Sequence, residues 1–184
     1  MVIGGSPNSG KTGYCLNIAK LNMDRFSVKY LSSEMRSEEL YVRLEKFDDH
    51  CVEEMFNKVN FVTCTSEFQD EIEPDSLNIV DYLEILEGDF YKIQDQIRKI
   101  FDKLNDGIAV ICLQKKKDQD LPRGGIGAIE KARIAIAIEN NVISIVKGKL
   151  WKAGLNPERL TRRFTLVGGV NFKWDPWEDR GALR

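Results

Sequence analysis

The sequence predicts an α/β fold: a mostly parallel, twisted sheet flanked by helices, with an antiparallel hairpin at one edge. Short, almost continuous apolar runs alternate with longer amphipathic stretches along the chain. Strands that are separated by helices pair in parallel and are covered on both faces, which explains their apolar character. Late in the chain, the pair Asn140-Asn141 separates two apolar runs and suits a tight hairpin turn.

The individual elements follow from these patterns in chain order. The apolar runs predict strands at about 1–5, 27–32, 60–64, 77–81, 108–113, 132–139, 142–147 and 163–167. Stretches with helical periodicity predict helices at about 10–23, 37–47, 49–58 and 88–105. The acidic segment 67–75 is expected to be a solvated loop or a poor helix, and the glycine-bearing segment 114–127 is expected to be a loop.

We expect these elements to form one domain, residues 1–172, followed by a C-terminal tail, residues 173–184, that frays from Glu178 onward. A chain of 184 residues is long enough to bury a substantial core. Trp174 and Trp177 lie within the predicted tail, where they are expected to cover an edge of the core or a subunit contact.

The composition indicates a cytoplasmic protein without a membrane partner. No apolar run approaches the roughly 18 residues that span a bilayer, and the start lacks a signal-peptide pattern. The four cysteines are scattered without metal-ligand spacing, which favours buried, reduced thiols. The net charge of −2 argues against wholesale attraction to nucleic acid, but a local basic loop can still contact phosphates.

A phosphate-binding loop is the strongest motif. The pattern G-x-x-x-x-G-K-[ST] stands between an apolar strand and an amphipathic helix, which is the context that this motif requires. In such a loop the backbone N–H groups and the helix N-terminus face the phosphates, Lys11 reaches the terminal phosphates and the Thr12 hydroxyl ligates Mg²⁺. The nucleotide-binding candidates are Gly5, Ser6, Pro7, Asn8, Ser9, Gly10, Lys11, Thr12 and Gly13.

Two acidic residues are placed to complete a site for ATP and Mg²⁺. Asp81 ends the apolar run 77–80 and is the candidate second metal ligand, although a strand cap is the simpler alternative. Glu34 follows the second strand and is expected to orient or deprotonate water, although alone it would be a solvated loop residue. Because carboxyl ends of parallel strands share one rim, both can meet the phosphate-binding loop.

Together with that loop, the segments Leu31-Ser32-Ser33-Glu34-Met35 and Ile79-Val80-Asp81-Tyr82-Leu83 resemble the ATPase domain of DnaB-type replicative helicases. These are RecA-like P-loop ATPases, and the resemblance covers residues 1 to about 147, in a trimmed form that suggests a phage or prophage source. It implies ATP hydrolysis in a homo-oligomeric ring, possibly of six subunits, around single-stranded DNA in replication or recombination. It also implies that Glu34 is the catalytic base and that Gln114, at the end of a strand, senses the γ-phosphate.

The resemblance further implies help from a neighbouring subunit. Family members supply a lysine and an arginine across the interface, and the matching place here reads Lys147-Gly148-Lys149. Lys147 and Lys149 are therefore the trans-acting candidates, but a lysine lacks the bidentate fork of a guanidinium. The arginine would have to come from elsewhere in the late strands: Arg159, Arg162 or Arg163. The family's amino-terminal domain and linker helix do not appear in the sequence.

The loop after Gln114 is the candidate DNA contact. It carries Lys115, Lys116, Lys117 and Arg123 ahead of two glycines, which suits sequence-independent contacts to a phosphate backbone. An ordinary solvated loop is the alternative, and the loop itself holds no aromatic residue on which a base could stack. Two other functions stay open: a nucleotide or small-molecule kinase with this basic stretch as its lid, and a regulatory or assembly ATPase without a nucleic-acid partner.

Overall fold

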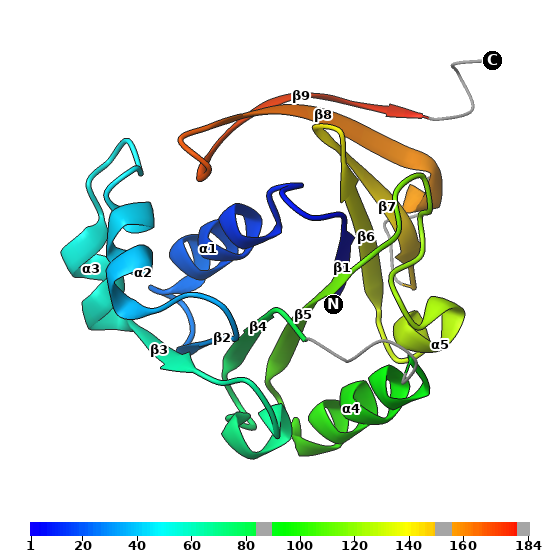
Figure 1. Ribbon diagram of the computed structural model, residues 1–184, viewed down its shortest axis with the longest axis horizontal. Helices are drawn as coiled ribbons and strands as arrows, with labels where there is room; N and C mark the ends of the chain where they lie inside the picture. The colour runs from blue at the N-terminus through cyan, green and yellow to red at the C-terminus, as the bar shows by residue number, and fades with distance from the viewer. Residues whose placement is uncertain (84–89, 150–155, 180–184) are drawn as a thin grey trace.

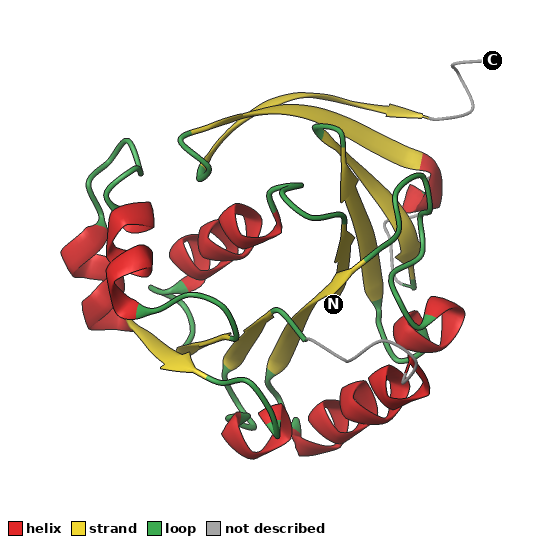
Figure 2. Ribbon diagram, in the orientation of Figure 1, coloured by secondary structure: helices red, strands yellow, loops and turns green. Residues whose placement is uncertain are grey.

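The computed structural model describes residues 1–83, 90–149 and 156–179, which form a single nine-stranded sheet with helices on both faces (Figure 1 and Figure 2). The strand order across the sheet is β3-β2-β4-β5-β1-β6-β7-β8-β9. Within the described ranges, no helix is both long enough and apolar enough to cross a membrane. The described helices and connecting loops are all attached to this one sheet.

The first six strands of that order run in parallel. They are β3 (Val59–Thr63), β2 (Val28–Ser32), β4 (Leu77–Asp81), β5 (Ile108–Gln114), β1 (Val2–Gly5) and β6 (Ile134–Glu139). The central strands are buried almost throughout, because helices cover both of their faces. The prediction of a mostly parallel sheet is confirmed.

Antiparallel strands complete the other edge: β7 (Val142–Gly148), β8 (Leu160–Val167) and β9 (Asn171–Asp179). The hairpin between β6 and β7 turns at Asn140 and Asn141, which have φ angles of 51° and 59°. Two successive residues with positive φ are typical of the tight turn that was predicted.

The last strand, β9, corrects the predicted tail. Residues 173–179 belong to β9 and pair with β8, whereas residues 180–184 lie outside the described part. Phe172 and Trp174 of β9 pack with Phe164 of β8, at centroid distances of 4.9 Å and 5.5 Å. In the sequence, Pro176 and the charged residues around it favoured a tail. In the structure, aromatic packing across the hairpin orders this segment as a strand.

Helices cover the two faces of the sheet in separate groups. One face carries α1 (Lys11–Asn22), α2 (Ser37–Leu44) and α3 (Val52–Lys58), and the other carries α4 (Phe90–Lys103) and α5 (Gly125–Ile129) (Figure 1). Helix α4 buries an apolar stripe at helical spacing: Ile93, Ile97 and Ile100. Of the predicted helix 88–105, residues 88 and 89 lie outside the described part, and α5 lies in a segment that was expected to be a loop.

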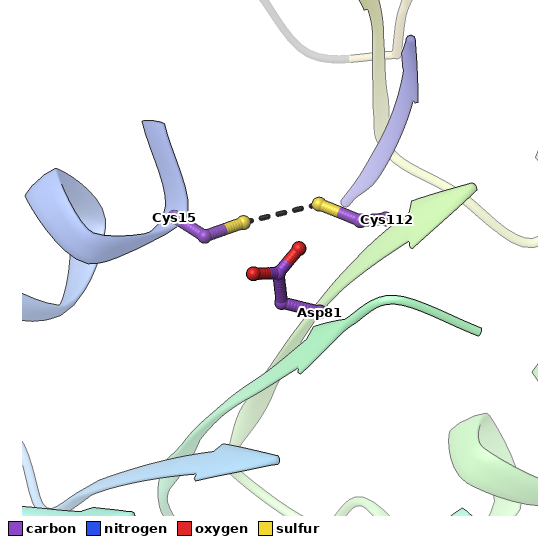
Figure 3. A group of neighbouring side chains, drawn as sticks. All are labelled: Cys15, Asp81 and Cys112. Atoms are coloured by element: carbon purple, nitrogen blue, oxygen red, sulfur yellow. Dashed lines mark hydrogen bonds between the residues drawn. The ribbon is translucent and has the colours of Figure 1, made fainter. Parts of the chain in front are cut away.

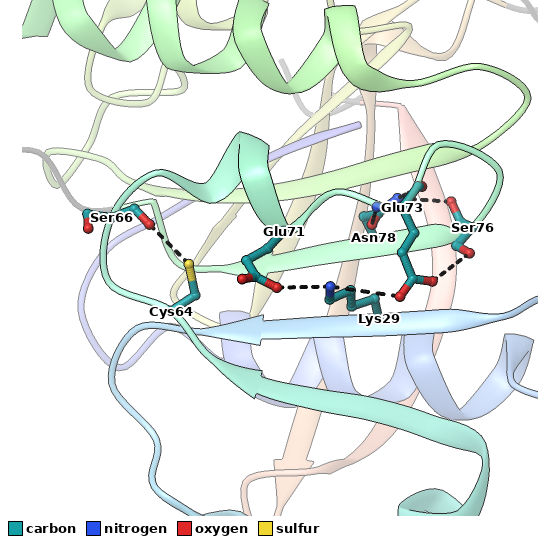
Figure 4. A network of polar contacts seen from close by, with 7 residues as sticks. All are labelled: Lys29, Cys64, Ser66, Glu71, Glu73, Ser76 and Asn78. Atoms are coloured by element: carbon teal, nitrogen blue, oxygen red, sulfur yellow. Dashed lines mark hydrogen bonds and ion pairs between the residues drawn. The ribbon is translucent and has the colours of Figure 1, made fainter.

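In the acidic segment 67–75, the structure agrees with the poor helix that was one of the two predicted alternatives. The segment contains a short 3₁₀ helix, Phe68–Glu71, whose Phe68 is buried in the core. The Lys29 ammonium lies 2.9 Å from a Glu71 carboxylate oxygen and 3.8 Å from one of Glu73 (Figure 4). The Asn78 side chain accepts from the Glu73 N–H and donates to the Glu73 carbonyl. The ion pairs of Lys29 and the hydrogen bonds of Asn78 therefore hold this acidic segment against the sheet.

Candidate functional site

The phosphate-binding loop connects the end of β1 to the start of α1. Gly10 has φ 96° and ψ 12°, a left-handed conformation that favours glycine. The Lys11 ammonium donates to the carbonyl oxygens of Gly5, at 3.0 Å, and Ser6, at 2.9 Å. A Cβ at Gly5 would lie 2.5 Å from the Ser9 hydroxyl oxygen, so the tight curl requires glycine there too. The loop thus has the compact form that the motif predicts.

A hollow of about 310 Å³ opens above this loop. Besides residues of the loop, it is lined by Glu34, Tyr82 and Gln114, which come from the ends of three other strands. Its volume lies at the lower end of the range for small-ligand sites. The structure therefore brings Glu34, Gln114 and Lys11 to one rim, as the parallel strands predicted for Glu34 and as the resemblance implied for Gln114.

Asp81 lies directly beneath that hollow, at the end of β4, and is only 4% exposed. The Tyr30 hydroxyl donates to it at 2.7 Å, and a hydrogen bond also joins it to the Thr12 side chain. Burial raises the pKa of Asp81 above its ordinary range, against the opposing effect of these hydrogen bonds and of Lys11. Thr12 and Asp81 offer hard oxygen donors side by side, which is the donor set that fits Mg²⁺.

The side chains of two cysteines lie next to the Asp81 carboxylate (Figure 3). The Sγ atoms of Cys15 on α1 and Cys112 on β5 are 3.1 Å apart, and both residues are fully buried. The hydrogen bond with Cys112, together with burial, raises the pKa of the Cys15 thiol well above its ordinary value. The two side chains therefore close the site beside Asp81, and all four cysteines are free and buried, as predicted for their burial.

The segment that holds Glu34 is fastened to Asp81 by hydrogen bonds. The Ser33 N–H donates to the Asp81 carbonyl at 3.0 Å, and the Tyr82 N–H donates to the Ser33 hydroxyl at 3.2 Å. The Ser32 hydroxyl accepts the Met35 N–H at 2.9 Å. These bonds fix the backbone on both sides of Glu34 and leave its carboxylate exposed at the rim.

Gln114 connects the hollow to the loop that follows β5. Its side-chain amide donates to the Tyr82 hydroxyl at 3.1 Å, and its backbone carbonyl accepts the Arg123 N–H at 2.8 Å. A bridge between Lys115 and Pro122 closes the same loop at its base. Gln114 therefore contacts both the rim of the hollow and the base of the basic loop.

Sequence reasoning missed the part of the site that β8 and β9 supply. Leu166 and Gly169 line the hollow, and a Cβ at Gly13 would lie 2.2 Å from the Gly169 carbonyl oxygen. The Asn17 amide donates to the carbonyls of Gly13, at 2.7 Å, and Val170, at 2.6 Å. In Figure 1 this hairpin arches over α1. No local pattern signals a contact between segments about 150 residues apart.

Arg43 of α2, a residue to which the sequence analysis gave no role, also lines the hollow. Its guanidinium lies 2.9 Å from a Glu39 carboxylate oxygen, one helical turn away. A guanidinium therefore belongs to the same lining as Glu34. A signal was present in the sequence, because an i,i+4 pair of opposite charges often lies along one helix face.

The basic loop is only partly available to a ligand. Lys115 is 4% exposed and forms an ion pair with Glu139, so it is not one of the solvent-facing cations that we expected. Lys116 and Lys117 are exposed, and Arg123 is half-buried. The backbone of Lys115 is bridged to Pro122 and its side chain is paired with Glu139, so this lysine stays buried. Lys116 and Lys117 follow the bridge and are exposed to solvent.

The two lysines predicted to act across a subunit interface, Lys147 and Lys149, have different environments. The Lys147 ammonium donates to the carbonyls of Ile129, at 2.6 Å, and Glu130, at 2.9 Å, so it closes the end of α5 in its own chain. Lys149 is exposed. Among the arginine candidates, Arg162 lies against Trp174 and Trp177, Arg163 is exposed, and the side chain of Arg159 lies outside the described part.

Solved structures with a similar fold exist, whereas no family model and no curated protein sequence matches the chain. One of these structures, an ATPase domain, superposes with a TM-score of 0.66 at 15% identity, over 93% of this chain and 82% of that one. The RadB recombinase superposes with a TM-score of 0.61 at 15% identity, over 92% of this chain and 87% of that one. The chain therefore has the fold of the RecA-like ATPases.

Proposed function

We propose that this protein binds ATP with Mg²⁺ and hydrolyses the nucleotide while acting on single-stranded DNA in replication or recombination. One observation carries the proposal: the phosphate-binding loop, Glu34 and Gln114 line one hollow, and Thr12 of that lining is hydrogen-bonded to the buried Asp81. The names of two proteins of the same fold, an ATPase domain and a recombinase, support this choice of activity.

Each residue of the hollow has a chemical task in this proposal. Lys11 exchanges the carbonyls of its own loop for phosphate oxygens, which also satisfy its ammonium. Thr12 and Asp81 hold Mg²⁺, which would neutralise charge on the phosphates when bound. Glu34 accepts a proton from the attacking water, and Gln114 donates to the outermost phosphate. The hydrogen bonds around Ser33 keep Glu34 in place for this task.

In the same proposal, the protein works as a homo-oligomeric ring in the cytoplasm, and a neighbouring subunit completes the site. Within the described part of the chain, the cation on the hollow's own lining besides Lys11 is Arg43, which is paired with Glu39. A cation brought by a neighbour would add stabilisation where charge develops in the transition state. Lys149 is exposed and is our candidate for that cation.

The ATP hydrolysis rate of Glu34→Gln, with and without single-stranded DNA, tests the proposal. We expect a rate at least about 100-fold below wild type with unchanged ATP affinity, because the substitution removes the general base and leaves the phosphate contacts intact. Glu38→Gln is the matched control, because Glu38 is an exposed acid in the first turn of α2 and does not line the hollow.

Three outcomes would contradict the proposal in different ways. A wild-type rate for Glu34→Gln would remove Glu34 from the chemistry. Phosphoryl transfer to an added acceptor in place of water would identify a kinase. A hydrolysis rate and an assembly state that both ignore single-stranded DNA would favour a regulatory or assembly ATPase.

A further inference from the structure

A second hollow, of about 430 Å³, lies beside the basic loop, which runs from Lys115 to Arg123. It is distinct from the hollow at the phosphate-binding loop, which we call the nucleotide hollow. Two elements line the second hollow: the start of α4, through Tyr91 and Gln94, and the loop after β5, through Lys116 and Arg123. The Gln94 amide donates to the Glu130 carboxylate at 2.8 Å, and Ile93 packs against Gly124. These contacts hold the first turn of α4 against the far end of the loop.

Tyr91 is the aromatic residue among the described residues that line this hollow. It is 70% exposed, whereas the isoleucines that follow it on the same helix are buried: Ile93, Ile97 and Ile100. The Lys92 ammonium lies 5.9 Å from the centre of the Tyr91 ring. An aromatic ring with its surface in water and cations near it is the arrangement that nucleic-acid-binding proteins use to stack a base.

The basic residues that line the second hollow favour a ligand that carries phosphates. Its lining includes Lys116 and Arg123, and among the described residues that line it none is acidic. This local balance differs from the chain as a whole, whose net charge is −2. A ligand that offers phosphates to the loop and a flat ring to α4 matches the lining, and a single-stranded nucleic acid has both.

We infer that Tyr91 is the base-stacking residue of a single-stranded DNA site whose phosphates contact Lys116 and Arg123. The inference rests on the proposed function and adds an aromatic residue that the basic loop itself does not contain. The Arg123 N–H donates to the Gln114 carbonyl at 2.8 Å, so this site and the nucleotide hollow are joined through Gln114. Bound DNA therefore contacts the loop that Gln114 holds.

The affinity for a fluorescently labelled thymidine oligonucleotide, measured by anisotropy over a range of salt concentrations, tests this inference. We expect Tyr91→Ala to weaken binding about five-fold or more, and Tyr91→Phe to bind as wild type, because stacking needs the ring and not the hydroxyl. Stacking releases no counterions, so the salt dependence of Tyr91→Ala should equal that of wild type. Lys116→Ala should instead lower the salt slope by about one.

Matched controls separate stacking from a change in the fold. Tyr41→Ala removes a tyrosine that is 48% exposed on α2 and lines neither hollow, so we expect wild-type DNA binding. Oligonucleotides with abasic positions should bind wild type and Tyr91→Ala equally, because no base is left to stack. In an oligonucleotide that carries 5-iodouracil, light should crosslink the base to Tyr91, as mapped by mass spectrometry of the peptides.

Two results would overturn the inference, and they differ. If wild type binds the oligonucleotide and Tyr91→Ala binds it equally well, with the crosslink elsewhere, the proposed function stands and Tyr91 is not a stacking residue. If wild type binds no single-stranded DNA at any salt concentration, the DNA part of the proposed function fails together with the inference.

Discussion

At the scale of single residues, Asp81 has the least favourable environment in the candidate site. Asp81 is 4% exposed, and its carboxylate lies near the Sγ atoms of Cys15 and Cys112 and is hydrogen-bonded to Tyr30 and Thr12. Burial raises its pKa because the charged form loses hydration. A buried carboxylate lowers the stability of the fold, because burial removes its hydration. Its presence here is therefore explained better by a role in holding a cation than by a role in folding.

We therefore expect Asp81→Asn to be more stable than wild type at neutral pH without nucleotide, by on the order of 1 kcal/mol. The folded pKa lies above the unfolded one, so ionisation opposes folding. Relative to Asp81→Asn, wild type should lose stability as the pH rises from about 3.9, the ordinary aspartate pKa, through the raised folded value. Urea unfolding from pH 4 to pH 8 measures this difference.

Nucleotide and a matched variant complete that comparison. Mg²⁺ and ATP together should stabilise wild type and fail to stabilise Asp81→Asn, because the variant lacks the anionic metal ligand. Asp106→Asn, at an exposed position outside the site, should follow wild type at every pH. A less stable Asp81→Asn protein at neutral pH, with a pH profile parallel to wild type, would contradict the argument.

At the scale of elements, the β8–β9 hairpin links the edge of the sheet to the phosphate-binding loop. Trp174 of β9 stacks on Phe172 at a centroid distance of 5.0 Å and meets Tyr14 of α1 edge-on at 6.2 Å. The tip of the hairpin contacts Gly13, and Leu166 lines the nucleotide hollow. The aromatic packing therefore positions one wall of that hollow.

Trp174→Ala should lower the free energy of unfolding by about 2 kcal/mol, because it removes a half-buried ring from this aromatic cluster. ATP affinity should fall with it, since Leu166 loses its support. Trp177→Ala is the control on the same strand: Trp177 is 43% exposed, so the loss should stay below about 1 kcal/mol. Equal losses in urea unfolding would show that the position of the ring does not matter.

At the scale of the whole molecule, four parallel strands end at one rim and bring the phosphate-binding loop, Glu34, Asp81 and Gln114 together. The exposed Lys149 lies at the other side of the sheet order, after β7. In the proposed ring, each hydrolytic site would join Glu34 of one subunit to Lys149 of the next.

Mixing two inactive variants tests this arrangement. Glu34→Gln and Lys149→Ala should each hydrolyse ATP slowly. In random mixed rings about a quarter of the interfaces would pair an intact Glu34 with an intact Lys149, so the mixture should recover about a quarter of the wild-type rate. Lys147→Ala should instead lower stability, because its ammonium caps α5. A mixture no faster than the mean of its two components would rule out Lys149 as the trans-acting residue.

The sequence by itself determined the features that depend on local order along the chain. Periodicity identified the parallel strands, Asn140-Asn141 identified the hairpin turn, and the spacing around Lys11 identified the phosphate-binding loop. Because the ends of parallel strands share a rim, the sequence also placed Glu34 near that loop, and the resemblance placed Gln114 there. Each of these follows from residues that are close in sequence or from the topology that they imply.

Only the tertiary structure decided which side chains are left for function. Lys115 and Lys116 are neighbours of the same type, yet one is buried against Glu139 and the other is exposed, because the partner lies on a distant strand. Likewise, Tyr91 reaches the basic loop, and the β8–β9 hairpin reaches the phosphate-binding loop, through packing between remote segments. Contacts of this kind depend on how the chain closes in three dimensions, which local sequence patterns do not encode.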